Sequence, residues 1–350
     1  MATTTKTKTD KMLRLGDMLR GCEPQRIQTV GYMQVIPLTS EVEDDRFSSP
    51  DAATIATRGY GSLMFHNTTS KTVIVPAQAA YVVKDAAQDH AMTGVGVVPK
   101  EKRNVEFNTA VCIQRNQGGL ITAGHHAMIV LPYILREKAH QTRLQTEYSR
   151  LWPSIEQMNV RAGLHTGAQV VDFLHHFEKE LNVFVAEFEP VPHQVGAIIL
   201  VDGVVVGVER APNSDFWKSV WRALIRECYG SFALLKAKEK GDAQPPPTRV
   251  PLRRATSLRD LKSALRDADE EERRRVKHVV DDVCDTVLDH EGNQKQDALD
   301  IDAWKHERFI GQTVKDGPQV VYGSVIGTEA WHKYAAWNQA RPFTMQVSRA

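Results

Sequence analysis

The sequence predicts an α+β protein with an antiparallel β-sheet or sandwich in its N-terminal half, flanked by helices. From Gly61 to Gln114, short β-type runs follow one another at close intervals, separated by turn-forming residues, which is typical of a small antiparallel sheet. The runs QVGAIILV and VVVGV, joined by Asp202-Gly203, predict a type I′ hairpin over 194–208. Apolar residues three or four apart elsewhere predict the helices.

The N-terminal 24 residues predict a frayed tail followed by one short helix over Met12 to Arg20. Gly31 to Leu38 predicts a strand, because it is rich in β-forming residues and Pro37 closes it. The stretch 40–50 is acidic and turn-rich. The main domain is expected to begin at residue 25 and to end near residue 238.

Helical spacing returns after the β-rich region. It extends over 131–151, and Pro153 marks the expected break. A single helix is predicted over 167–182, because its apolar residues form one stripe. The hairpin is followed by a predicted helix over 212–235, for which Asn213, Ser214 or Asp215 could serve as the N-cap.

The C-terminal part divides into three segments. Residues 239–256 contain Gly241 and three consecutive prolines, which predicts a linker. Residues 257–292 predict a long inserted amphipathic helix whose N-terminus is a capping box of Ser257 and Asp260. Residues 293–350 predict strands and an aromatic tail that pack back on the main domain.

The composition is that of an ordinary globular protein, with 42% hydrophobic and 25% charged residues. Lys and Arg number 44 against 43 Asp and Glu, which argues against binding to nucleic acid or to an anionic membrane. The four cysteines form no CxxC pair and no apolar run approaches about 18 residues, so reduced thiols and no membrane segment are expected. We expect a cytoplasmic protein.

The first polar cluster is Lys84 to His90, between two β-type runs. Asp89 and His90 place an acid and an imidazole on one turn beside the amide of Gln88, which favours general acid–base chemistry with Gln88 and Asp89 as ligand contacts. The alternative is a solvated connecting loop, where such residues are common.

The second polar cluster is the strand end and turn CIQRNQGG. Cys112 is a candidate nucleophile, with His125 or His126 as its base. The backbone amides of Gly118 and Gly119 could face an anionic ligand, and Gln114 could contact it. Alternatively, Cys112 is a small buried hydrophobe and the glycines form a turn.

Glu209 ends a very apolar strand and is a third candidate, as a catalytic base. Its alternative is to cap the sheet edge with charge. The pairs His125-His126 and His175-His176 suggest a metal site, but adjacent helical residues point about 100° apart and no third ligand follows at a recognisable spacing. We therefore predict no metal site and name no cofactor.

Several segments, read in order, carry a family resemblance. These are PQRIQTVGYMQVIPL, the β run with AQDH, VEFNTAVCIQ, QVGAIILVDGVVVGVER and FWKSVWRALIRECYG. Together they resemble the ADP-ribosylglycohydrolase- and rhodanese-phosphatase-associated protein domain over 25–235, and 319–326 would supply its closing strand. The resemblance implies an α+β domain associated with ADP-ribose-processing hydrolases and phosphatases.

The resemblance also carries over to single positions. It implies that Gln88 and His90 match a family glutamine and basic residue, and that Cys112 to Gln114 match a family strand. Gln114 stands where the family has an acid, so a mechanism that needs a carboxylate there is not expected here. The segment 239–290 would be an insertion of this subgroup.

The leading hypothesis is a domain that binds or hydrolyses a nucleotide-derived, phosphorylated or ADP-ribose-linked small molecule in a cleft between the β-region and the hairpin. The alternative is a non-enzymatic, self-associating interaction or structural protein of the kind that a mobile element could carry, with a homo-oligomer formed through the 257–292 helix. A third reading, nucleic-acid binding through arginines near residues 249–259, is opposed by the balanced charge.

Overall fold

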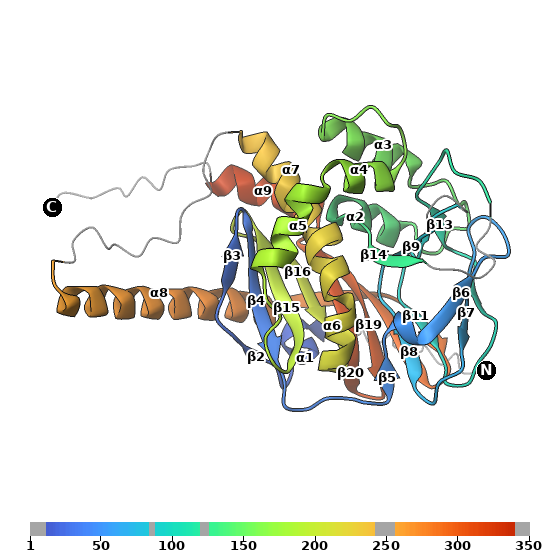
Figure 1. Cartoon of the computed structure of the whole chain (residues 1–350). Helices are drawn as coiled ribbons and strands as arrows, with labels where there is room; N and C mark the ends of the chain where they lie inside the picture. Colours follow the sequence, from blue (N-terminus) through green and yellow to red (C-terminus); the bar gives the residue numbers. More distant parts are fainter. Residues whose placement is uncertain (1–11, 84–87, 120–125, 242–255, 340–350) are drawn as a thin grey trace, which may run out of the picture.

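The computed structural model describes residues 12–83, 88–119, 126–241 and 256–339 (Figure 1). Their largest element is a ten-stranded antiparallel sheet. Its strands follow the order β1 (Met12–Arg14), β17 (Val287–Gln296), β18 (Leu299–Lys305), β19 (Phe309–Asp316), β20 (Gln319–Gly327), β16 (Val204–Arg210), β15 (Gln194–Val201), β4 (Met33–Thr39) and β2 (Glu23–Pro24), with β3 (Gln28–Val30) also paired to β4.

This main sheet must be curled, because its edge strands β1 and β2 are joined by very few residues. A flat sheet with this order of nine strands would separate its two edge strands by eight spacings of about 4.8 Å, or about 38 Å. The link from Arg14 to Glu23 spans at most about 25 Å, since it includes the helix α1 (Leu15–Met18). The two edges therefore approach each other around α1.

Three smaller sheets lie beside the main sheet in the described residues. The first contains β13 (Val111–Cys112), β10 (His90–Ala91), β9 (Ala79–Val82) and β14 (Ala127–Val130). The second contains β11 (Gly96–Val98), β8 (Thr72–Val75) and β5 (Phe47–Ser48), and the third β12 (Val105–Phe107), β7 (Leu63–Asn67) and β6 (Ala53–Ala56), which follows the 3-10 turn η1 (Pro50–Ala52). The prediction of short, paired strands between Gly61 and Gln114 is thus confirmed.

Helices cover the two faces of the main sheet, and each face has its own core (Figure 1). One face packs against α2 (Tyr133–Gln141), α3 (Trp152–Arg161), α4 (Val170–His176), α5 (Glu178–Glu187), α6 (Ser214–Arg222), the π-helix η2 (Ala223–Gly230) and α7 (Ser231–Lys240). The other face packs against α1 and the C-terminal half of α8 (Leu258–Asp285). A last helix, α9, spans Glu329–Gln339.

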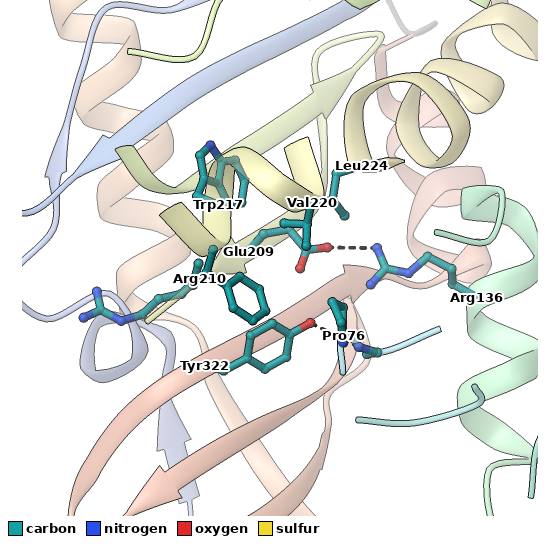
Figure 2. Close-up of a pocket in the computed structure, with 11 residues that line it drawn as sticks. Pro76, Arg136, Glu209, Arg210, Trp217, Val220, Leu224 and Tyr322 are labelled. Carbon is teal, nitrogen blue, oxygen red and sulfur yellow. Dashed lines mark hydrogen bonds and ion pairs between the residues drawn. The ribbon is translucent and has the colours of Figure 1, made fainter. Parts of the chain in front are cut away.

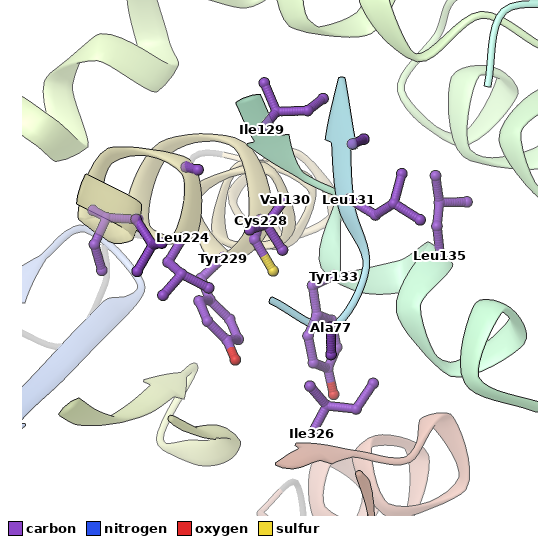
Figure 3. Close-up of a cluster of buried hydrophobic side chains, with 14 of the residues drawn as sticks. Ala77, Ile129, Val130, Leu131, Tyr133, Leu135, Leu224, Cys228, Tyr229 and Ile326 are labelled. Carbon is purple, nitrogen blue, oxygen red and sulfur yellow. The ribbon is translucent and has the colours of Figure 1, made fainter. Parts of the chain in front are cut away.

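The core under η2 joins distant parts of the chain. Figure 3 shows Cys228 and Tyr229 of η2 facing Leu131 and Tyr133 just before and at the start of α2, with Ile326 of β20 beside them. All five side chains are at most 5% exposed. Burying an apolar side chain of this size contributes about 1.5–3 kcal/mol, so this contact fixes α2 and η2 on the sheet.

The predicted α+β class and the predicted hairpin are confirmed. Asp202 and Gly203 both have positive φ, at 54° and 78°, as a type I′ turn requires. The helix after the hairpin begins at an N-cap supplied by Asn213, whose side chain accepts a hydrogen bond of 2.8 Å from the Phe216 amide. Among the described residues, no helix is long and apolar enough to cross a membrane.

Several predicted elements have different bounds. Residues 167–182 form two helices and not one, because Phe177 leaves the helical conformation between α4 and α5 while its side chain stays in the shared apolar stripe. The predicted helix over 257–292 ends at Asp285, since Thr286 is extended and Val287 begins β17. Met12 to Arg20 holds the strand β1 before α1.

The C-terminal residues belong to the main sheet. β17 and β18 were not predicted, and β17 exposes polar residues because it lies next to the short edge strand β1. Trp304 is buried under α8, whereas Trp331 and Tyr334 stack on each other on α9. Some predictions concern residues outside the described ones. These are His125, residues 84–87 of the first polar cluster and residues 242–255 of the predicted linker.

Candidate functional site

Strand pairing brings the two predicted polar clusters together. In the first small sheet, His90 of β10 faces Cys112 of β13 on one side and Tyr81 of β9 on the other. Residues directly opposite in antiparallel strands project from the same face, so these three side chains form a row. The neighbouring residues Gln88 and Asp89 precede β10, and Gln114 follows β13. We call these five predicted residues and Tyr81 the polar cluster: Gln88, Asp89, His90, Cys112, Gln114 and Tyr81.

The His90 imidazole is held in one neutral tautomer. Its Nδ1 lies 2.8 Å from the Gln88 carbonyl oxygen, to which it donates, and its Nε2 accepts a hydrogen bond of 3.1 Å from the Gly61 amide. Burial lowers the pKa of His90 below its usual value. The predicted role of His90 as a base does not fit this geometry, because the Nε2 lone pair is already occupied by a backbone amide.

Asp89 is better suited to acid–base chemistry. Its side chain is buried, and Oδ1 accepts a hydrogen bond of 2.7 Å from the Val83 amide. Burial raises the pKa of Asp89 to about 6, although the hydrogen bond from Val83 opposes this shift. A carboxyl group that titrates near neutral pH can both accept and donate a proton.

Cys112 is present as a thiol at neutral pH. Burial raises the pKa of Cys112 to about 11, and its Sγ lies 3.4 Å from both the amide nitrogen and the carbonyl oxygen of Gln114. A nucleophilic cysteine needs a lowered pKa, so this environment favours the buried-hydrophobe alternative. His126, one of its predicted bases, packs edge-on against Tyr81.

Three buried polar atoms in this region have no hydrogen-bond partner among the described residues. They are Gln88 Oε1, Gln114 Oε1 and the Tyr81 hydroxyl. The other end of the Gln114 amide is fixed, since its Nε2 donates to Gln169 Oε1 over 2.9 Å. Buried polar atoms are nearly always paired, and leaving one unpaired costs about 1–3 kcal/mol. This concentration of unpaired atoms favours a ligand-binding role.

A row of aromatic rings begins at His90 of the polar cluster, with Tyr60 exposed and Tyr148 and Trp152 half-buried. Tyr60 stacks on His90 with a centroid separation of 6.5 Å, Tyr148 lies 5.4 Å from Tyr60, and Trp152 lies 5.7 Å from Tyr148. We call Tyr60, Tyr148 and Trp152 the aromatic ladder. The guanidinium of Arg115 lies over the Trp152 ring at 5.6 Å.

The predicted glycines lie at the Tyr60 end of this aromatic ladder. The Gly119 amide donates to the Tyr60 hydroxyl at 3.5 Å, and a side chain at Gly118 would come within 3.9 Å of that hydroxyl. Sequence reasoning missed the ladder, because Tyr60 comes from a segment far in the chain from the one that holds Tyr148 and Trp152. The one local signal was the four-residue spacing of Tyr148 and Trp152.

Glu209 lies in a different environment, the core between β16 and η2. Its Oε1 accepts a hydrogen bond of 2.8 Å from Arg136 Nη1 (Figure 2). The same oxygen accepts a hydrogen bond of 2.5 Å from the Tyr229 hydroxyl. Arg136 also donates to Gln78 at 3.0 Å and to Ser324 at 2.5 Å. Both charged side chains are at most 3% exposed.

The space beside this ion pair is small. The cavity has a volume of about 10 Å³ and is lined by Pro76, Phe216, Trp217 and Tyr322 in addition to the ion pair (Figure 2). That volume holds about one water molecule, so it excludes a nucleotide-sized ligand. No described residue of the polar cluster hydrogen-bonds to Glu209. Glu209 is thus part of a buried ion-pair network and not of the candidate site.

Metal binding finds no support in the described residues, where no three His, Cys, Asp or Glu side chains are arranged to hold an ion. The fold and the polar cluster instead define an α+β domain with a buried polar face next to partly exposed aromatic rings. The chain belongs to the ARPP-1 family, the ARG and Rhodanese-Phosphatase-superfamily-associated Protein domain, whose model matches residues 21–309. Comparisons with curated proteins and with solved structures gave no match.

The match is longer than the resemblance in the sequence suggested. It extends from β2 through α8 and β18 and leaves out β1. The polar cluster, the aromatic ladder and the Arg136–Glu209 pair all lie within it. The status of α8 as an insertion of a subgroup stays a prediction.

Proposed function

We propose that this protein binds a nucleotide-derived small molecule, of the ADP-ribose-linked class, at the polar cluster and the aromatic ladder. One observation carries the proposal. Gln88 and Gln114 have unpaired buried amide oxygens. In the chain, Gln88 lies two residues before His90, which stacks on Tyr60. Gln114 directly precedes the exposed Arg115, which lies over Trp152. The family name, which records association with ARG and rhodanese-phosphatase-superfamily proteins, agrees with this ligand class.

Each part of the site suits one part of such a ligand. An adenine ring would stack on an aromatic face, an interaction worth about 1–3 kcal/mol. The Arg115 guanidinium would pair with a phosphate through parallel hydrogen bonds. The Gln88 and Gln114 oxygens would accept hydrogen bonds from ribose hydroxyls, which removes the penalty of leaving them unpaired.

Hydrolysis of the bound molecule is the second part of the proposal. Asp89, with a pKa of about 6, would accept a proton from the attacking water and return it to the leaving group. His90 would position this turn, since both ring nitrogens hydrogen-bond to backbone groups. Cys112 would contribute shape and not a covalent intermediate.

Calorimetric titration with ADP-ribose, AMP and ribose 5-phosphate tests binding. We expect ADP-ribose to bind most tightly, because it adds a second phosphate and a second ribose to the adenine and phosphate that AMP offers, and because ribose 5-phosphate has no ring to stack. Trp152→Leu and Arg115→Gln should each weaken binding by about 5- to 100-fold. Tyr334→Leu is the matched control, since this exposed tyrosine lies on α9. Absence of heat with all three ligands, or unchanged affinity in both site variants, would refute the proposal.

Chromatographic detection of released products tests hydrolysis separately. We expect Asp89→Asn to retain binding and to lose turnover, because an amide cannot shuttle a proton but can still accept the hydrogen bond from Val83. If the wild-type protein binds ADP-ribose and releases no product, the binding role stands and the hydrolytic role fails.

A second candidate function is self-association through the long helix. The observation that favours it is the projection of α8 from the body of the protein (Figure 1). This second function does not depend on the polar cluster or on the aromatic ladder.

A further inference from the structure

The N-terminal half of α8 lacks a packing partner within the described chain. Figure 1 shows this orange helix extending away from the sheet, and its buried residues begin only at Val276. Leu258 and Leu265 are 77% and 48% exposed. In globular proteins an amphipathic helix gains most of its stability by packing its apolar face. The exposed leucines therefore mark a face that a partner would cover.

A groove runs along the other half of the same helix. It lies between α8 and the segment Pro24–Arg26 and has a volume of about 590 Å³. Val276 and Val280 supply its apolar lining. Its charged lining residues on α8 are Asp269, Glu272, Arg273, Lys277 and Asp281. An amphipathic helix with a leucine on its apolar face fits this pattern of an apolar centre and a charged rim.

The charges of α8 alternate in blocks along its 28 residues. A basic block (Arg259, Lys262, Arg266) is followed by an acidic block (Asp267, Asp269, Glu270, Glu271, Glu272), a second basic block (Arg273, Arg274, Arg275, Lys277) and a second acidic block (Asp281, Asp282, Asp285). An antiparallel copy of the helix reverses this order, so the first basic block meets the second acidic block and Asp269 and Glu270 meet the second basic block. Glu271 and Glu272, at the two-fold axis, face like charges. A parallel copy in register would bring like charges together.

We propose that two copies of this chain associate through antiparallel pairing of their α8 helices, with the projecting half of each helix in the groove of the other. The register that matches the charge blocks sets Lys262 opposite Asp281. It places Leu265 over Val276 and Val280, and Asp269 opposite Arg273. A two-fold axis makes each contact twice, so the groove and the exposed leucine of both chains are covered at once.

Light scattering coupled to size-exclusion chromatography tests the pairing at micromolar concentrations. We expect a mass of twice the 39.2 kDa of one chain. Leu265→Asp should raise the dimer dissociation constant by at least about 100-fold, because it places two charges in the two apolar grooves. Leu144→Asp is the control, since this leucine is 65% exposed outside α8. Circular dichroism establishes that each variant folds.

A charge exchange tests the register. Lys262→Glu or Asp281→Lys alone should weaken the dimer, whereas the double variant should restore it, because the exchanged charges meet only across the two chains. A monomeric wild type, as expected if the 242–255 segment or a different protein fills the groove, overturns the proposal. A dimer that Leu265→Asp leaves intact also overturns the proposal. The register is overturned if the double variant dimerises more weakly than both single variants.

Discussion

Removing the positive charge of Arg136 should be among the most destabilising substitutions in this protein. Arg136→Met keeps most of the side-chain volume but leaves the Glu209 carboxylate buried, with the Tyr229 hydroxyl at 2.5 Å as its remaining partner in the network. Removing one partner of a buried ion pair costs about 3–5 kcal/mol. The Gln78 and Ser324 side chains also lose a donor.

Urea unfolding measures this cost. With a slope of about 3 kcal/mol per molar urea, the midpoint should fall by about 1–2 M. Lys333→Met is the matched control, because Lys333 and Glu329 form an ion pair of 2.8 Å with side chains more than 70% exposed. Such pairs contribute about 0–1 kcal/mol, so the control should shift the midpoint by no more than about 0.3 M.

A double variant separates the lost ion pair from the lost packing. Arg136→Met with Glu209→Gln removes the unpaired charge and keeps a group that can bond to Tyr229, so it should recover a large part of the stability. The reasoning is refuted if Arg136→Met shifts the midpoint no more than the control does. It is equally refuted if the double variant is as unstable as the single one.

Three further outcomes follow from individual side chains. Because the pKa of Asp89 is raised to about 6, the folded protein binds the Asp89 proton more tightly than the unfolded chain does. The free energy of unfolding of the wild type, relative to that of Asp89→Asn, should therefore fall by up to about 2–3 kcal/mol as pH rises from about 4 to about 6. Urea unfolding at several pH values measures this difference. Gly207→Ala should lower the free energy of unfolding by more than about 2 kcal/mol, because its Cβ would lie 2.1 Å from the Tyr229 hydroxyl. Gly292→Ala is the control and should lower it much less in the same assay, because its Cβ would have no atom within 4 Å. Since burial raises the pKa of Cys112 to about 11, mass spectrometry after brief alkylation at pH 8 should find it unlabelled in the folded protein and labelled in urea; rapid native labelling would contradict this.

The sequence was sufficient for elements whose signal is local. The hairpin follows from Asp202-Gly203 between two apolar runs, and the α8 cap is confirmed by the hydrogen bond of 3.2 Å from the Asp260 amide to the Ser257 hydroxyl. β17 gave no such signal, because its sequence LDHEGNQKQ is polar and its strand conformation depends on pairing with β1 and β18. Tertiary pairing decides its structure, not propensity.

The candidate site was predictable only in part. Gln88 to His90 and Cys112 to Gln114 stand out as polar groups at strand ends, but their proximity depends on the pairing of β10 with β13. The aromatic ladder joins Tyr60 to Tyr148 and Trp152 in a distant part of the chain, so the spacing of the last two could not reveal their contact with Tyr60. Glu209 was singled out correctly as an unusual carboxylate, but its partner Arg136 lies 73 residues away, and that partner gives it a structural role.

The curled main sheet also constrains the order in which this chain can fold. β1, near the N-terminus, pairs with β17, with Met12 opposite Asp289. At a synthesis rate of about 5–20 residues per second, the N-terminal strand waits tens of seconds on the ribosome for its partner. During that interval the apolar side chains of α1 lack the core that α8 and β20 later complete. Folding of this sheet is therefore a late event that requires nearly the whole chain, and it exposes the N-terminal segment to chaperones and proteases until then.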